Sequence, residues 1–246
     1  ALHRHQVAVR DHREGAGHEG APARIAHIPV TRSARYALWG EPGPEVRQLW
    51  VVLHGYRQLA QRFGRRFAPL ATSQRVVVAP EALNRFYLDD APGRHGSESR
   101  VGATWMTRED RDTEIQDYVA YLDRLHGVIA EPLPRDIRTV GLGFSQGCHT
   151  LARWAALGEV EFDTLVFWGE VLPPDLDLDA ARDGFGEARI LSVQGREDKH
   201  LTPELLRRQK GQMDALGRTM STHWHPGGHR LEAYVLSEVV EMLDRP

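Results

Sequence analysis

One stretch of this sequence predicts the fold: Arg138-Thr139-Val140-Gly141-Leu142-Gly143-Phe144-Ser145-Gln146-Gly147-Cys148. It begins as an apolar run typical of a buried strand and continues through Gly-Phe-Ser-Gln-Gly into a helical pattern. A G-x-S-x-G string between strand and helix is the pattern of a nucleophile elbow, a turn so sharp that the serine hydroxyl is exposed. Gly143 and Gly147 leave room where strand and helix cross, because neither has a Cβ. Ser145 is therefore the candidate nucleophile, at a helix N-terminus that favours developing negative charge.

Apolar runs typical of buried strands alternate with helical patterns along most of the chain, which predicts an α/β fold with a mostly parallel sheet covered by helices on both faces. Besides the strand before Ser145, strands are expected at residues 25–30, 34–39, 49–53, 75–80, 164–168, 190–193 and 220–224, with an edge strand at 5–9. Helices are expected at residues 59–72, 112–129, 146–157, 203–216 and 231–243. Residues 81–111 form a long connection of the kind that often has a function.

No internal repeat or linker divides the chain, so we expect one domain over residues 1–246, with 1–24 as a peripheral N-terminal segment. Ligands of open α/β sheets bind beyond the carboxyl ends of the strands. Ser145, Asp198, His229 and the segment 54–56 all follow predicted strands, so they are expected to meet at one edge.

A serine hydroxyl needs a base within hydrogen-bond reach to act as a nucleophile. The chain has 13 histidines, so a histidine alone carries little information. His229 is the candidate base because it follows Pro226-Gly227-Gly228 after the last strand. His223 and His225 are rivals, but one lies inside the predicted strand and the other directly precedes a proline.

The base in turn needs a carboxylate that orients it. Asp198, in the loop after the strand 190–193, is the candidate acid. Glu170 is the main alternative because it also follows a strand, whereas Glu197 is less well placed. The order Ser145, Asp198, His229 is the order expected of an α/β-hydrolase.

Acyl transfer also needs donors for the oxyanion. We expect the backbone N–H groups of Gln146, directly after the nucleophile, and of Tyr56, in the loop after the strand ending at Leu53. His54 is interpreted as a structural hydrogen-bonding residue of that loop.

The composition is ordinary for a globular protein: 41% hydrophobic, 26% charged, net charge −3. It gives no sign of nucleic-acid or anionic-membrane binding. No apolar run approaches the ~18 residues of a membrane-spanning helix. The single cysteine, Cys148, is expected to be a small core residue. No signal-peptide core is visible, and we expect a cytoplasmic location.

Two readings of another class are retained. His223, His225 and His229 could form a metal site, although the serine motif would then be coincidental. The chain could also be a catalytically silent binding module on a hydrolase fold.

Four segments in order resemble the phospholipase/carboxylesterase family of the α/β-hydrolase superfamily, which includes bacterial carboxylesterases and acyl-protein thioesterases. They are Leu53-His54-Gly55-Tyr56, Gly143-Phe144-Ser145-Gln146-Gly147, the loop from Gly195 to Asp198, and Gly227-Gly228-His229. The similarity covers about residues 47–243. It implies Ser145 as nucleophile, His229 as base, Asp198 as acid, and no cofactor or metal.

The resemblance also implies an acyl site. Gly102-Ala103-Thr104-Trp105 is similar to the family segment whose tryptophan lines that site, and Trp105, Met106, Trp168 and Tyr56 are the candidate walls. Acyl-protein thioesterases typically carry Leu-Gly-Asp after His-Gly, whereas this chain has Tyr56-Arg57-Gln58.

The expected function is a serine hydrolase that cleaves carboxylic esters of short to medium acyl length through an acyl-enzyme. Lysophospholipase or acyl-thioesterase activity on the same residues is the alternative. The expected partner is a small-molecule ester, and a homodimer is one option for the assembly.

Overall fold

The computed structural model describes residues 23–89 and 95–245. From Ala34 onward the chain forms one compact unit. Residues 23–33 have no regular secondary structure and are exposed, so the strand expected at 25–30 is not formed. Its apolar residues Ile25, Ile28 and Val30 are all exposed, which means that the pattern lacks the buried face a strand needs. The strand expected at 5–9 lies outside the described residues.

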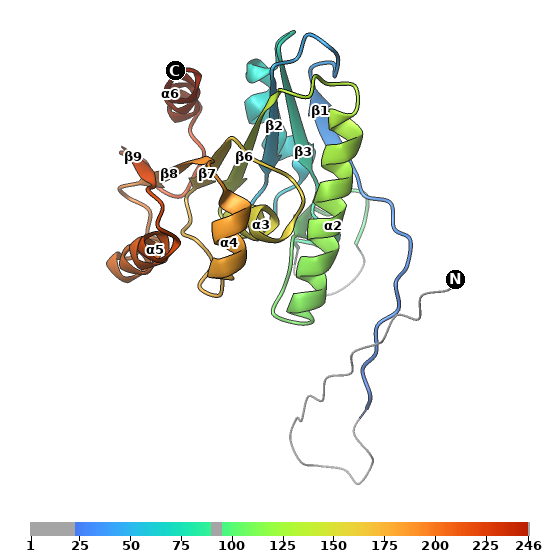
Figure 1. The fold of residues 1–246 in the computed structure, drawn as a ribbon. Coiled ribbons are helices and arrows are strands. Elements are labelled where there is room, and N and C mark those ends of the chain that lie inside the picture. The colour runs from blue at the N-terminus through green and yellow to red at the C-terminus, as the bar shows by residue number, and fades with distance from the viewer. Residues whose placement is uncertain (1–22, 90–94, 246) are drawn as a thin grey trace, which may run out of the picture. The chain divides into compact units, whose positions relative to one another are not determined.

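A seven-stranded sheet forms the centre of the compact unit (Figure 1), in the order β1-β3-β2-β6-β7-β8-β9. All neighbouring strands are parallel except β1, which pairs antiparallel with β3. The predicted α/β fold with a mostly parallel sheet is therefore confirmed. The strands are β1 (Tyr36–Trp39), β2 (Gln48–Leu53), β3 (Arg75–Pro80), β6 (Arg138–Phe144), β7 (Thr164–Trp168), β8 (Arg189–Gly195) and β9 (Ser221–His225).

Helices cover both faces of the sheet, because its central strands carry apolar side chains on both sides. Successive residues of β2 show this: Val51 belongs to one core and Val52 to the other. The first core packs against α2 (Arg111–Ala130), α3 (Gln146–Leu157), α4 (Leu178–Phe185) and α5 (Pro203–Leu216). The second packs against α1 (Ala60–Gly64) and α6 (Ala233–Asp244).

Three further regions differ from the sequence-based expectation. The connection 81–111 contains a hairpin of β4 (Asn84–Tyr87) and β5 (Val101–Thr104), whose strands are only four residues long. The short helix α4 was not expected; it begins after Asp177, whose carboxylate accepts two backbone N–H groups. The helix expected at 59–72 is α1 followed by a 3-10 helix, Arg65–Leu70, which contains Pro69.

No helix among the described residues is long and apolar enough to cross a membrane. The parallel strands end at a common edge, where the loops after β2, β6, β7, β8 and β9 begin. Ser145, Asp198 and His229 follow β6, β8 and β9, so the fold brings three distant parts of the chain to that edge.

Candidate active site

Ser145 occupies a strained turn between β6 and α3. Its φ is 52° and its ψ is −121°, in the positive-φ region that residues with a Cβ rarely adopt. A Cβ on Gly147 would overlap the backbone oxygen of Leu53, and one on Gly143 would overlap that of Gly147. The two glycines therefore allow the turn, and the Ser145 N–H holds it by donating to the Trp168 carbonyl at 2.9 Å.

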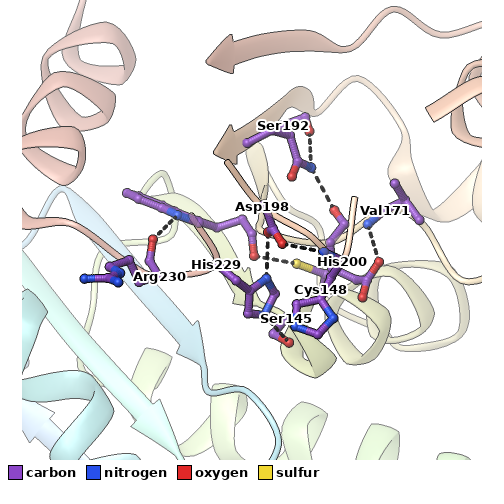
Figure 2. Close-up of polar contacts among 11 residues, drawn as sticks. Ser145, Cys148, Val171, Ser192, Asp198, His200, His229 and Arg230 are labelled. Atoms are coloured by element: carbon purple, nitrogen blue, oxygen red, sulfur yellow. Dashed lines mark hydrogen bonds and ion pairs between the residues drawn. The ribbon is translucent and has the colours of Figure 1, made fainter. Parts of the chain in front are cut away.

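The side chains of Ser145, His229 and Asp198 form one hydrogen-bonded row (Figure 2). His229 Nε2 lies 3.0 Å from Ser145 Oγ, and His229 Nδ1 lies 2.7 Å from Asp198 Oδ2. An ionised carboxylate only accepts, so Nδ1 carries the proton and donates to Asp198. Nε2 is then free to accept from the Ser145 hydroxyl, which is the arrangement a general base needs.

Asp198 is shielded from water, whereas His229 is partly accessible: their side chains are 1% and 24% exposed. The second oxygen of Asp198, Oδ1, accepts the backbone N–H of His200 at 2.9 Å. A buried carboxylate with both oxygens engaged has little freedom to rotate, and it therefore fixes the orientation of the imidazole.

The loops after β8 and β9 are bonded to each other, which explains why Asp198 and His229 meet. The Glu197 N–H donates to the Gly227 carbonyl at 3.1 Å. A Cβ on Gly195 would overlap that same carbonyl, so only glycine permits the approach. The His229 ring also packs against Phe144, with ring centroids 5.2 Å apart.

The alternative acid, Glu170, is near the row but does not hold the imidazole nitrogen. Its carboxylate accepts the Val171 N–H at 2.9 Å. Burial raises the pKa of Glu170, and the positive charge that His229 can carry opposes this rise.

The rival histidines are directed elsewhere. His223 Nε2 pairs with Glu238 at 3.0 Å, and His225 is buried with its Nδ1 accepting the Gly227 N–H at 3.1 Å. The histidines of the alternative metal site thus have separate partners. Within residues 23–89 and 95–245, no group of three or more His, Cys, Asp or Glu side chains is arranged to hold a metal ion.

Two backbone N–H groups at the site, those of Tyr56 and Gln146, have no acceptor among the described residues. Gln146 is the first residue of α3, where N–H groups lack partners within the helix. Its side chain is bonded to the neighbouring loop, since Nε2 donates to Thr104 Oγ1 and to the Met106 carbonyl at 2.9 Å each.

His54 is fully buried and bonded at both ring nitrogens. Nδ1 lies 2.8 Å from the Gly55 carbonyl, and Nε2 accepts the Ala82 N–H at 3.1 Å. Burial lowers the pKa of His54 to about 4, so the ring is neutral at pH 7. This is the structural role that the sequence indicated.

The four residues expected to form the pocket walls differ in their burial. Trp105 and Trp168 are each 1% exposed and lie in the two cores. Their indole N–H groups donate to the carbonyls of His54 and Arg230, at 2.8 and 3.2 Å. Both rings therefore support the site loops from beneath instead of forming an open wall. Met106 is partly buried and Tyr56 is exposed, so these two remain candidates.

Sequence reasoning missed His200. Its ring lies edge-on to that of His229, with centroids 4.8 Å apart, and Figure 2 shows it beside the row. Its position two residues after Asp198 was the available signal, but 13 histidines gave no reason to select it.

A model of the family described as serine hydrolase (FSH1) matches residues 47–231, more than half of the chain. The chain belongs to the FSH1 serine hydrolase family. No curated protein matches this FSH1 serine hydrolase by sequence.

Solved structures of esterases and thioesterases share its fold. A carboxylesterase from Mesorhizobium loti superposes with a TM-score of 0.62 at 19% identity, covering 87% of this chain and 95% of that one. A phospholipase/carboxylesterase from Dyadobacter fermentans gives 0.61 at 16% identity, covering 89% and 100%. Acyl-protein thioesterase 2 of Zea mays gives 0.59 at 18% identity, covering 86% and 98%. These likenesses establish the α/β-hydrolase fold that the motifs predicted.

Proposed function

We propose that this FSH1 serine hydrolase cleaves carboxylic esters through an acyl-enzyme on Ser145. The observation that carries the proposal is the hydrogen-bonded row from Ser145 Oγ through His229 to the buried Asp198. The strained turn that presents the serine also supports the proposal, because a chance contact between two of these side chains would not need such a turn. Two solved structures with the same fold are described as a carboxylesterase and a phospholipase/carboxylesterase, which adds support.

In the first half of the reaction, Ser145 Oγ attacks the ester carbonyl while His229 Nε2 takes the hydroxyl proton. Asp198 stabilises the imidazolium that forms, because its carboxylate stays bonded to Nδ1–H. The N–H groups of Tyr56 and Gln146 then donate to the carbonyl oxygen as it becomes negative. Each such donor is worth roughly 10²–10³ in rate in enzymes of this kind.

The tetrahedral intermediate collapses when His229 returns the proton to the leaving alcohol, which leaves the acyl group on Ser145. Water then attacks the acyl carbon while His229 Nε2 takes its proton. The acyl–serine bond breaks, His229 returns the proton to Ser145 Oγ, and the carboxylic acid leaves. A thioester could follow the same course, with a thiol in place of the alcohol as the leaving group. Comparing butyryl oxoesters with butyryl thioesters will decide which one the enzyme prefers.

The decisive variant is Ser145→Ala. We expect hydrolysis of 4-nitrophenyl acetate to fall by at least ~10³-fold, because the acyl-enzyme cannot form. Ser237→Ala, at an exposed serine of α6, is the matched control and should keep wild-type activity.

A fluorophosphonate should add one label to the wild type, at Ser145, and none to Ser145→Ala. Circular dichroism of both variants will verify the fold. Undiminished turnover by the folded Ser145→Ala variant would refute the proposed function.

A further inference from the structure

A cleft of about 180 Å³ adjoins the loop that carries Tyr56. Three arginines, Arg57, Arg62 and Arg66, line it together with the apolar side chains of Leu59 and Phe63. We call it the arginine cleft. Among the residues that the structure describes, no acidic side chain lines the cleft.

The three guanidinium groups make no ion pair or side-chain hydrogen bond with any residue in the described part of the chain. Other arginines behave differently: Arg35 is bonded to Glu81, and Arg75 is bonded to Asp244. Arg62 and Arg66 are four residues apart along α1 and the 3-10 helix, a spacing that puts like charges side by side. Cations without a partner among the described residues, gathered in a concave site, favour an anion, although the whole chain has a net charge of −3.

The backbone holds Arg57 in place. Its φ is 68°, a left-handed conformation that residues with a Cβ rarely adopt. Its N–H donates to the Ala103 carbonyl at 2.9 Å, and the Ala103 N–H donates to the Gln58 carbonyl at 3.1 Å. A Cβ on Gly102 would overlap the Arg57 carbonyl, so β5 presses closely against this turn. Strain that the surroundings enforce is concentrated at functional sites.

The arginine cleft and the nucleophile lie on either side of one short loop, residues 55–58. On one side, a Cβ on Gly55 would lie 3.2 Å from Ser145 Cβ. The Gly55 N–H also donates at 2.8 Å to the side chain of Gln58, which lines the cleft. On the other side, the Phe63 ring of the cleft lies 6.1 Å from the ring of Phe144, the residue before Ser145.

We propose that the arginine cleft binds an anionic group of the ester substrate, a phosphate or a carboxylate. The inference rests on the proposed function and specifies the substrate class for it. Guanidinium groups bind both anions through paired hydrogen bonds. Three cations favour the dianionic phosphate over the carboxylate, and the volume suits a phosphate with a few carbons over Leu59 and Phe63. An ester that spans residues 55–58 would place its carbonyl at Ser145 and its anion in the cleft.

The test compares two substrates that differ only by a phosphate: 1-butyryl-glycerol 3-phosphate and 1-butyryl-glycerol. The wild type should hydrolyse the phosphorylated ester with the higher kcat/KM. In Arg62→Gln/Arg66→Gln, kcat/KM for the phosphorylated ester should fall by about tenfold or more, because two charged hydrogen-bond donors are lost. For the neutral ester it should stay within about twofold.

Arg65→Gln is the matched control, since Arg65 is an exposed arginine beside Arg66 that does not line the cleft. It should leave the ratio of the two kcat/KM values unchanged. The single variants Arg62→Gln and Arg66→Gln, each with a smaller fall, serve if the double variant does not fold.

A second pair locates the anion. If kcat/KM of the double variant falls for 4-nitrophenyl hydrogen glutarate and not for 4-nitrophenyl butyrate, the cleft binds a carboxylate on the acyl side.

Equal rates for anionic and neutral esters in both pairs, or equal losses in the variants, would overturn the inference. So would an Arg65→Gln effect as large as that of the double variant. These outcomes leave the proposed function intact as long as neutral esters are hydrolysed and Ser145→Ala abolishes that hydrolysis.

Discussion

Two carboxylates near His229 interact with it in different ways. Asp198 is hydrogen-bonded to Nδ1 at 2.7 Å, whereas Glu170 accepts the Val171 N–H and interacts with the imidazole through its charge. Asp198→Asn should therefore lower kcat by about 10³–10⁴-fold, because an amide can donate to Nδ1 and favour the wrong tautomer. Glu170→Gln should keep most of the activity at pH 8. The reverse ranking of the two variants would contradict the assignment of the acid.

Glu170 should instead be visible in the pH profile. Burial raises the pKa of Glu170, and the charge of His229 opposes this rise. In Glu170→Gln that carboxylate is absent, so the part of the acidic limb of kcat/KM that follows the ionisation of Glu170 should be lost. The profile of 4-nitrophenyl acetate hydrolysis from pH 5 to 8 measures this. Identical profiles for the variant and the wild type would show that the charge of Glu170 does not act on the site.

At the scale of elements, the crossing of β6 and α3 depends on the absence of a side chain. A Cβ on Gly147 would overlap the Leu53 carbonyl at the end of β2, and backbone cannot move aside as a flexible side chain can. Gly147→Ala should thus lower the free energy of unfolding by about 2 kcal/mol or more and displace Ser145.

The matched control is Gly211→Ala in α5, where nothing lies within 4 Å of the added Cβ. It should raise the free energy of unfolding by up to about 1 kcal/mol, since alanine favours the helix. Urea denaturation measures both variants. A Gly147→Ala variant as stable as the wild type would argue against a tightly packed elbow.

At the scale of the whole molecule, two histidines link folding to pH: His54, which is buried, and His149, which is partly buried. Burial lowers the pKa of His54 and of His149 from 6.5 to about 4. Between these values the unfolded chain binds protons that the folded chain does not, so stability is complete above pH 6.5 and declines as the pH falls towards 4. The loss should be roughly 1 kcal/mol per histidine and pH unit.

Urea denaturation at pH 7, 6 and 5 tests this expectation, and His149→Gln should reduce the slope of stability against pH. An equal free energy of unfolding at pH 7 and pH 5 would contradict it. His149 is informative because its buried Nε2 has no hydrogen-bond partner in the described residues, so a proton there gains no bond.

The sequence predicted the features that depend on local patterns. The apolar runs of β2, β3, β6 and β7 identified the parallel sheet, because a strand covered on both faces must be apolar throughout. Gly-Phe-Ser-Gln-Gly identified the elbow, because only glycine fits where the strand and the helix cross on either side of the serine. The hairpin β4–β5 and α4 escaped notice because short, partly exposed elements leave weak periodicity.

The amino-acid sequence by itself determined that a serine, an aspartate and a histidine would follow strands of one sheet. Only the tertiary structure decided which carboxylate contacts His229, that Trp105 and Trp168 are core residues, and that three arginines share a cleft. The physical reason is that such contacts depend on the paths of loops packed against each other. The carbonyl of Gly227 against Gly195 is an example, and no local pattern in the chain records it.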